Sequence, residues 1–305
     1  MSGPLDPMLR ARVAGRRVLV TGASSGLGLE LARRLGAAGA ELVLPVRNRE
    51  RGDRAADRIR AAAPAASIEL RDLDLASLAS VRALTARLTA EDRPIDVLVL
   101  NAGIALIGDR ERHVTEDGFE RHFQTNFLAH AALVLGLLSL LERSRARVVV
   151  QCSIASTVVG VRWGDLQFER RYRPFRAYGS SKTALGLFAV ELARRMPGLT
   201  VALAHPGIVP DTGIAPDIRA RVRADLRELA LRRIGNRPAQ AVTPALRGIV
   251  ADLPAGAAPM SFSPAGWCGM AGPSRTGRAP RYLRDPLGAT EVWALAEELT
   301  ARLRN

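Results

Sequence analysis

The sequence predicts an α/β protein built on a doubly wound parallel sheet, and three observations favour this class. Short apolar runs alternate with helical patterns along most of the chain, as in repeated β–α units. Two of the runs, Ile95–Leu100 and Arg147–Gln151, are apolar enough to form strands that are buried on both faces. A glycine-rich turn, Gly22–Gly28, connects the first run to the first helical pattern, which is typical of a Rossmann-type dinucleotide-binding fold.

The elements follow one another in a regular order. The first strand is the aliphatic run Arg17–Thr21, and the helix after the glycine turn has the pattern LELARRLGAAGA. Further apolar runs predict the later strands, and apolar residues spaced three and four apart predict the later helices. The predicted strands are Glu41–Val46, Ile68–Leu70, Ile95–Leu100, Arg147–Gln151 and Leu199–Ala204, and the helices are Glu50–Ala62, Leu75–Leu88, Phe119–Leu141 and Ala177–Arg195.

The pattern becomes less regular after Gly207. We expect a helical flap at residues 211–237, a helix at 239–250 and a closing helix at Glu291–Arg302, whereas 254–286 is rich in Gly, Pro, Ser and Arg without periodicity. Because no repeat or linker divides the chain, we predict a single domain. Its parts are a flexible N-terminus at residues 1–14, a Rossmann-fold, dinucleotide-binding unit at 15–253 and an irregular C-terminal extension at 254–305.

The composition excludes several classes of protein. Hydrophobic residues make up 48% and charged residues 24% of 305 positions, which argues against a disordered or fibrous chain. Two cysteines, Cys152 and Cys268, without a Cys/His cluster predict neither a disulfide framework nor a metal site. The longest apolar run, Ala131–Leu141, is too short to cross a bilayer, and the first residues lack the apolar stretch of a signal peptide. We expect a cytoplasmic protein with no membrane partner.

The net charge of +14 is spread along the chain rather than gathered in one basic motif. The richest segment, Arg219–Arg237, alternates arginine with acidic residues, as on a solvated helix face. No helix-turn-helix or zinc-finger pattern is visible. We therefore expect no nucleic-acid partner, and binding through this segment stays an alternative that a salt-dependent shift with DNA or RNA would test.

Lysine occurs once in the chain, at Lys182, and all the other residues among the 44 Lys+Arg are arginine. This lysine follows Tyr178 by four residues in a helical pattern, so the two side chains share one helix face. A cation in that place favours the phenolate and lowers the tyrosine pKa, as an acid or base at neutral pH requires. Taken alone, the pair could also be an exposed tyrosine beside a solvated lysine.

Polar residues stand where the predicted strands end, and the carboxyl ends of parallel strands form the ligand-binding edge of such a sheet. They are Gly22, Arg47, Asp74, Asn101, Ser153 and His205–Gly207. After the second strand no carboxylate occurs before Glu50, whereas a carboxylate there would favour NAD(H). The guanidinium of Arg47 suits a 2′-phosphate instead, so we predict NADP(H) as the cofactor.

Seven short motifs together resemble the short-chain dehydrogenase/reductase family. They are TGASSGLG at Thr21–Gly28, LDL at Leu73–Leu75, NAG at Asn101–Gly103, TN at Thr125–Asn126, QCS at Gln151–Ser153, YGSSK at Tyr178–Lys182 and HPG at His205–Gly207. They occur in the family's order over about residues 15–250. The segments TEDGFERHFQTNFLAH and FRAYGSSKTAL are similar to the branch of retinol dehydrogenases and protochlorophyllide reductases. The N-terminal membrane anchor of the microsomal members is not expected here.

The resemblance implies a role for each matching residue. Tyr178 exchanges a proton with the substrate oxygen, Lys182 lowers the pKa of Tyr178 and binds the nicotinamide ribose, Ser153 orients the carbonyl, and Asn126 holds a water for proton relay. Asp74 accepts a hydrogen bond from the adenine, and the backbone of Ile208 meets the nicotinamide carboxamide, with Thr212 as a further candidate. The full set implied to bind the cofactor is Gly22, Ser24, Ser25, Gly26, Leu27, Gly28, Arg47, Asp74, Leu75, Asn101, Ala102, Gly103, Tyr178, Lys182, Pro206 and Ile208.

The function predicted from these residues is an NADPH-dependent carbonyl reductase or alcohol dehydrogenase acting on a lipophilic, even polycyclic, ketone or aldehyde. Reduction of a C=C bond, as in protochlorophyllide reductases, and non-catalytic dinucleotide binding are the alternatives. The aromatics Trp163, Phe168, Tyr172 and Phe175 lie in a segment expected to contribute to the substrate pocket and predict a flat apolar substrate. The resemblance also allows a homo-oligomer. We expect His122, His130 and His205 to order or pack the chain and Cys152 to be a buried strand cysteine rather than a reactive thiol.

Overall fold

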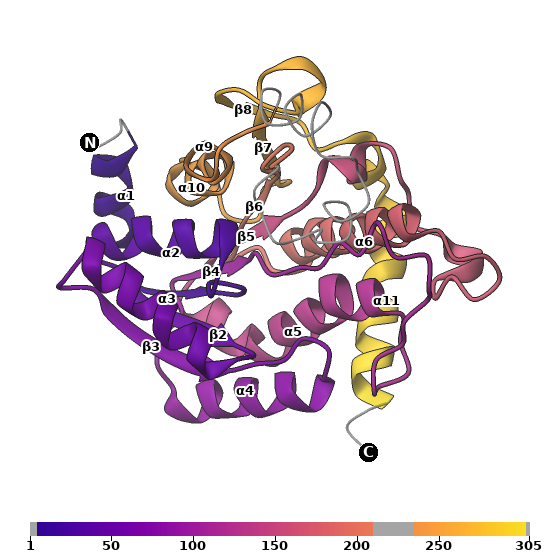
Figure 1. Cartoon of the computed structure of the whole chain (residues 1–305), viewed down its shortest axis with the longest axis horizontal. Coiled ribbons are helices and arrows are strands. Elements are labelled where there is room, and N and C mark those ends of the chain that lie inside the picture. The colour runs from indigo at the N-terminus through magenta and orange to yellow at the C-terminus, as the bar shows by residue number, and fades with distance from the viewer. Residues whose placement is uncertain (1–4, 210–234, 303–305) are drawn as a thin grey trace.

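The computed structural model describes residues 5–209 and 235–302, and Figure 1 shows its arrangement. An eight-stranded sheet has the order β3-β2-β1-β4-β5-β6-β7-β8, with every neighbouring pair parallel except β7 and β8. The strand order reverses between β1 and β4, and such a reversal opens a crevice at the strand ends. The strands are β1 (Arg17–Val20), β2 (Glu41–Val46), β3 (Ser67–Asp72), β4 (Val97–Leu100), β5 (Arg147–Gln151), β6 (Thr200–Ala204), β7 (Met260–Pro264) and β8 (Ser274–Gly277).

Helices cover both faces of the sheet and divide the apolar core into two layers (Figure 1). One layer contains α1 (Asp6–Val13), α2 (Gly26–Ala37), α3 (Arg49–Ala62), α9 (Pro238–Ala241) and α10 (Thr243–Val250). The other contains α4 (Leu78–Glu91), α5 (Ala129–Arg143), α6 (Pro174–Arg195) and α11 (Pro286–Arg302). The predicted Rossmann-type α/β fold is confirmed.

Both ends of the chain are more ordered than the sequence predicts. The expectation of a flexible N-terminus is wrong for residues 6–13, because they form α1 and bury Leu9 and Val13 in the core. The C-terminal extension is also less irregular than expected, since β7 and β8 continue the sheet beyond β6. Short strands with one large buried side chain, here Phe262, leave no periodic signal in the sequence.

The central helix departs from a regular α-helix where Asn126 lies. Instead of one helix over Phe119–Leu141, a π-helical turn at Phe123–Leu128 leads into α5. Within the described ranges, Phe123–Arg143 is the one stretch long and apolar enough to cross a membrane, and it is mostly buried as a core helix. π-helical turns are rare and frequently lie at functional sites.

The closing helix α11 packs on α6, the helix that carries Tyr178 and Lys182. Trp293 is fully buried and stacks on Phe188, with ring centroids 4.9 Å apart and planes 8° from parallel. The guanidinium of Arg195 lies 5.0 Å from the indole centroid. The C-terminal extension therefore supports the rear of the helix that faces the strand ends. The flap expected at residues 211–237 lies outside the described residues as far as residue 234.

Candidate active site

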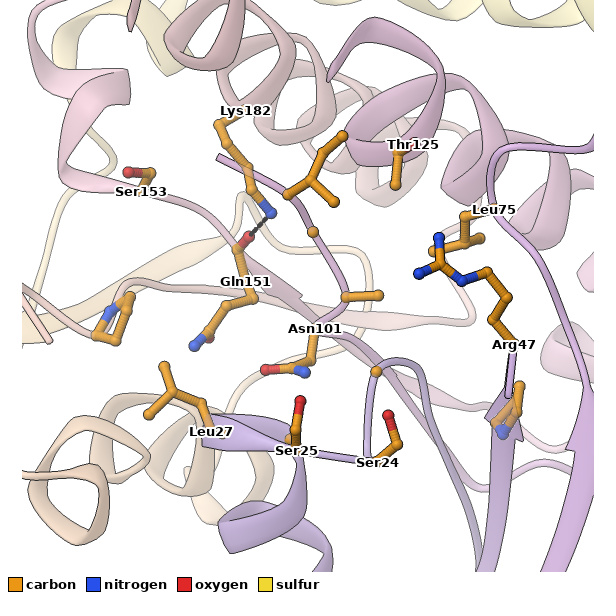
Figure 2. A pocket seen from close by; sticks show the side chains of 18 of the residues that line it. Ser24, Ser25, Leu27, Arg47, Leu75, Asn101, Thr125, Gln151, Ser153 and Lys182 are labelled. Atoms are coloured by element: carbon orange, nitrogen blue, oxygen red, sulfur yellow. Dashed lines mark hydrogen bonds between the residues drawn. The ribbon is translucent and has the colours of Figure 1, made fainter. Parts of the chain in front are cut away.

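A cavity of about 500 Å³ lies at the carboxyl ends of the strands (Figure 2). Fifteen of the sixteen residues implied to bind a dinucleotide and three of the four implied catalytic residues line it, Tyr178 and Lys182 being in both sets. Asn126 and Ile208 are the predicted residues that do not line it. The sequence motifs thus converge on one cavity, although they come from segments more than 150 positions apart. The predicted residues in the lining are Gly22, Ser24, Ser25, Gly26, Leu27, Gly28, Arg47, Asp74, Leu75, Asn101, Ala102, Gly103, Ser153, Tyr178, Lys182 and Pro206.

The turn between β1 and α2 has room only for glycine at two positions. Gly22 has a φ of +72°, in the left-handed region that glycine adopts readily. A Cβ on Gly28 would lie 2.2 Å from the carbonyl oxygen of Gly22. Ser25 precedes the helix and its side chain makes no capping bond, so the first N–H groups of α2 are free to bind a phosphate. The turn therefore fits the pyrophosphate of a dinucleotide.

A buried network joins the ends of β1 and β4 beneath this turn. The hydroxyl of Thr21 accepts hydrogen bonds of 3.0 Å from the backbone N–H groups of Asn101 and Ala102. His130, which has no exposed surface, lies 3.1 Å from the same hydroxyl through Nε2 and 3.2 Å from the carbonyl of Asn126 through Nδ1. Burial and then the charge of Lys182 lower the pKa of His130 to about 3. The imidazole is neutral and structural, as its predicted packing role requires.

Two arginines, Arg47 and Arg51, also line the cavity. In Figure 2, Arg47 extends from the end of β2 toward the cavity, on the same side as Ser24. Arg51, in the first turn of α3, lines the cavity as well. Neither side chain makes an ion pair with the described residues, while their neighbour Arg49 is 3.7 Å from Asp72. Two uncompensated guanidinium groups at this position suit a phosphate.

Asp74 and Ile208 use part of their hydrogen-bonding capacity within the protein. The Asp74 carboxylate accepts a 2.9 Å bond from the backbone N–H of Ala76 through Oδ1, and its side chain still lines the cavity. Ile208 donates its N–H to the carbonyl of Met270 and accepts from the N–H of Asn236, each at 2.8 Å. The backbone contact expected from Ile208 therefore competes with two existing bonds. Thr212 lies outside the described residues.

Ser153, Tyr178 and Lys182 line the same cavity. The Lys182 ammonium is 3% exposed and donates a 3.1 Å hydrogen bond to the carbonyl oxygen of Gln151, drawn in Figure 2. Burial lowers the pKa of Lys182 to about 8. The Ser153 hydroxyl accepts a bond from the N–H of Ala155, which leaves its own proton available for another acceptor.

The predicted effect of Lys182 on Tyr178 is not found. Burial raises the pKa of Tyr178 above its ordinary value of 10, a hydrogen bond with Ser153 opposes this rise in part, and the nearby Cys152 adds to it. Tyr178 is therefore a protonated phenol at neutral pH. Burial also raises the pKa of Cys152 to about 12, so this residue is a thiol, not a reactive thiolate.

Asn126 supports the cavity wall from behind. Its Oδ1 accepts a 2.8 Å bond from the N–H of Ile104, and its Nδ2 donates 3.0 Å bonds to the carbonyl of Ile104 and the hydroxyl of Ser181. A Cβ on Gly103 would lie 3.1 Å from Asn126 Oδ1 and 3.0 Å from Lys182 Nζ. The π-helical turn thus places the amide directly behind the loop that follows β4.

Comparison with known proteins agrees with this geometry. The model of the family described as short chain dehydrogenase matches residues 16–223. The chain belongs to this family. Retinol dehydrogenase 12 of Mus musculus is 40% identical over 201 residues, which cover 65% of this chain and 63% of the relative. The chain therefore matches less than two thirds of the length of this relative. The resemblance to the retinol-dehydrogenase-like branch is confirmed.

Two solved structures extend the comparison of this short-chain dehydrogenase. An uncharacterised protein of Mycobacterium paratuberculosis has a TM-score of 0.71 and 32% identity, covering 96% of this chain and 97% of that one. A Beutenbergia cavernae protein assigned as an NAD(P)-dependent gluconate 5-dehydrogenase, with NADP bound, has a TM-score of 0.61 and 28% identity, covering 80% and 91%. The first shows that the fold extends over nearly the whole chain, C-terminal extension included.

Several residues that line the cavity of this short-chain dehydrogenase were not predicted. Gln151 could have been found from its place before Ser153 in the QCS motif. Arg51 in the first turn of α3 and Ile104 and Leu106 in the loop after β4 carry no such signal. The residues in the lining that were given no place in the site are Pro45, Val46, Arg51, Leu73, Ile104, Leu106, Arg121, Thr125, Gln151, Cys152 and Val209.

The aromatic residues expected to contribute to the substrate pocket do not line this cavity. Phe168 is buried in the core with a φ of +52°, and Trp163 is 39% exposed. Tyr172 and Phe175 instead line a separate cavity near the start of α6. The four aromatic residues therefore do not share one wall, because η3 (Trp163–Asp165) and the chain after it separate them.

Proposed function

We propose that this protein is an NADP(H)-dependent oxidoreductase that interconverts a lipophilic carbonyl compound and the corresponding alcohol. The observation that carries the proposal is that Ser153, Tyr178 and Lys182 line the same cavity as the glycine turn and Arg47. Proton donors thus stand in the same cavity as groups that fit phosphates. The names of the relatives, a retinol dehydrogenase and a dehydrogenase with NADP bound, support the same class of reaction.

Each catalytic role follows from the state of the side chain. Bound NADPH supplies the hydride. Tyr178, whose raised pKa keeps its proton at neutral pH, donates that proton to the carbonyl oxygen, and Ser153 donates a hydrogen bond to the same oxygen. Lys182, with a pKa near 8, binds the nicotinamide ribose and returns a proton toward Tyr178. Asn126 holds the loop after β4 in place through its bonds to Ile104. A water bound to its Oδ1 would relay protons to Lys182.

The decisive test replaces Tyr178 by phenylalanine. Tyr178→Phe removes the proton donor and should lower kcat for carbonyl reduction by about 10²–10⁴-fold, while the Kd for NADPH changes less than about threefold. Tyr282→Phe, at an exposed tyrosine away from the cavity, is the matched control and should retain full activity. A Tyr178→Phe enzyme with normal turnover would refute the mechanism. Deuterium transferred from labelled NADPH should appear on the alcohol carbon.

Cofactor preference is tested separately. The ratio of kcat/KM with NADPH to that with NADH should fall about tenfold in Arg47→Ala and again in the double variant with Arg51→Ala, since each guanidinium binds a phosphate. Arg49→Ala changes the same charge at a residue paired with Asp72 and should leave the ratio unchanged. An unaltered ratio in the double variant would refute the assignment of NADP(H).

A further inference from the structure

A second cavity, of about 600 Å³, is lined by neighbouring stretches of the same loop and helix as the first. Its walls are Ile107, Gly108 and Arg110 of the loop after β4, and Tyr172–Arg176 at the start of α6. The same loop and the same helix contribute Gly103–Leu106, Tyr178 and Lys182 to the first cavity. Pro174 precedes Tyr178 by four residues, one helical turn or about 5 Å along α6.

A chain of buried contacts joins this cavity to Tyr178. The Tyr172 hydroxyl lies 3.4 Å from Nδ1 of His122 and 3.4 Å from the Glu120 carboxylate. Nε2 of His122 accepts a 3.0 Å bond from the N–H of Leu106 in the shared loop. The His122 ring meets the Tyr178 ring edge to face, with centroids 6.1 Å apart. Tyr178 of the first cavity and Tyr172 of the second therefore flank the same buried residue, His122.

The second cavity combines apolar surface with uncompensated positive charge. Phe175 is 44% exposed and Tyr172 partly exposed, which offers contact for a hydrocarbon chain. Arg110, Arg173 and Arg176 are exposed and form no ion pair within the described part of the chain, unlike Arg112, which lies 3.7 Å from Glu169. None of the described residues that line this cavity is a carboxylate, so the three like charges repel one another until an anion joins them.

We propose that the second cavity binds a carboxylate at the far end of the substrate, whose carbonyl group lies at Tyr178. The substrate class is therefore an aldehyde or ketone with an apolar chain that ends in an acid. This inference rests on the proposed function and narrows its substrate. Guanidinium groups recognise carboxylates through charge-assisted hydrogen bonds, and the apolar rings bind the connecting chain.

The experiment compares ω-oxo carboxylates of several chain lengths with their methyl esters, which have the same chain without the charge. The ratio of kcat/KM for the acid to that for the ester should reach about tenfold at the best length, as expected of two or three partly solvated ion pairs. It should fall toward one in Arg173→Gln/Arg176→Gln and at high salt. Arg171→Gln makes the same charge change outside the cavity and should keep the wild-type ratio.

A binding measurement separates this inference from the proposed function. Calorimetric titration of the protein with a saturated fatty acid and with its methyl ester requires no turnover. Wild type and Arg171→Gln should bind the acid about tenfold more tightly than the ester, whereas Arg173→Gln/Arg176→Gln should bind the two equally. If both aldehydes are reduced equally and the arginine variants change nothing, the second site is refuted and the reductase stands. If no aldehyde is reduced but the acid binds through the arginines, the site stands and the reductase is refuted. Equal binding of acid and ester overturns the site.

Discussion

Because of His130, we expect the free energy of unfolding of this protein to decrease as the pH falls into the mildly acidic range. The imidazole is fully buried and bonded to Thr21 and to the carbonyl of Asn126. Because the carbonyl can only accept, Nδ1 carries the proton, and Nε2 accepts the proton of the Thr21 hydroxyl. Protonation of Nε2 would break that bond and place a charge near the Lys182 ammonium. We predict that His130→Gln, whose amide can still accept from Thr21, removes much of the acid sensitivity.

The size of this loss of stability follows from the pKa values of His130 in the folded and in the unfolded protein. The pKa of His130 is about 3 in the folded protein against an ordinary 6.5 when exposed. Unfolding therefore takes up a proton below pH 6.5, so stability is complete above that pH and falls as the pH drops toward 3. Between pH 7 and pH 5 the loss of stability is about 2 kcal/mol, and it reaches about 4 kcal/mol at pH 3, where half of the folded His130 is protonated.

Urea unfolding at pH 7 and pH 5 measures this loss for wild type and His130→Gln. The difference in free energy of unfolding between the two pH values should be about 2 kcal/mol smaller in the variant, even if the variant is less stable at both. His205, whose pKa burial and then the charge of Arg275 lower to about 4, should contribute a similar, additive amount in His205→Gln. An equal pH dependence in wild type and His130→Gln would show that the buried imidazole is not the sensor.

Three further outcomes test other parts of the structure. Gly28→Ala places a Cβ 2.2 Å from the carbonyl of Gly22 and should raise the Kd for NADPH at least about tenfold, whereas Gly277→Ala, which meets no atom within 4 Å, should not. Trp293→Ala should lower the free energy of unfolding by about 3–5 kcal/mol, measured by urea titration. Acylation of Lys182, the single lysine, followed by peptide mass, should rise with a midpoint near pH 8 and be slowed by NADPH.

Local sequence signals predicted the parts of the site that local geometry determines. The glycine turn requires a positive φ at Gly22 and the close approach of the backbone at Gly28. Because only glycine meets both requirements, they can be recognised in the sequence. The strand-end residues came together because parallel strands share one ligand-binding edge. Arg47 was found in this way from one strand end alone. Neither inference required knowledge of how distant elements pack.

Features that depend on packing between distant elements were not predicted. The network of Thr21, His130 and Asn101 joins residues about 80 to 110 positions apart, and no spacing in the sequence reveals it. The four aromatic residues between 163 and 175 are close in the chain, yet η3 and a buried Phe168 separate them. The strands β7 and β8 formed because β6 offered a free edge, which is a property of the sheet rather than of their own residues.

The pair of Tyr178 and Lys182 shows how spacing can predict proximity without predicting its effect. Both side chains line the cavity, but the carbonyl of Gln151 binds the ammonium, and burial raises the pKa of the phenol instead of lowering it. Desolvation disfavours the charged form of each group, so at neutral pH the cavity favours a phenol that gives up its proton only to a reacting partner. That state suits a proton donor to a carbonyl oxygen. In the proposed function, alcohol oxidation needs the phenolate and should therefore gain more from alkaline pH than carbonyl reduction does.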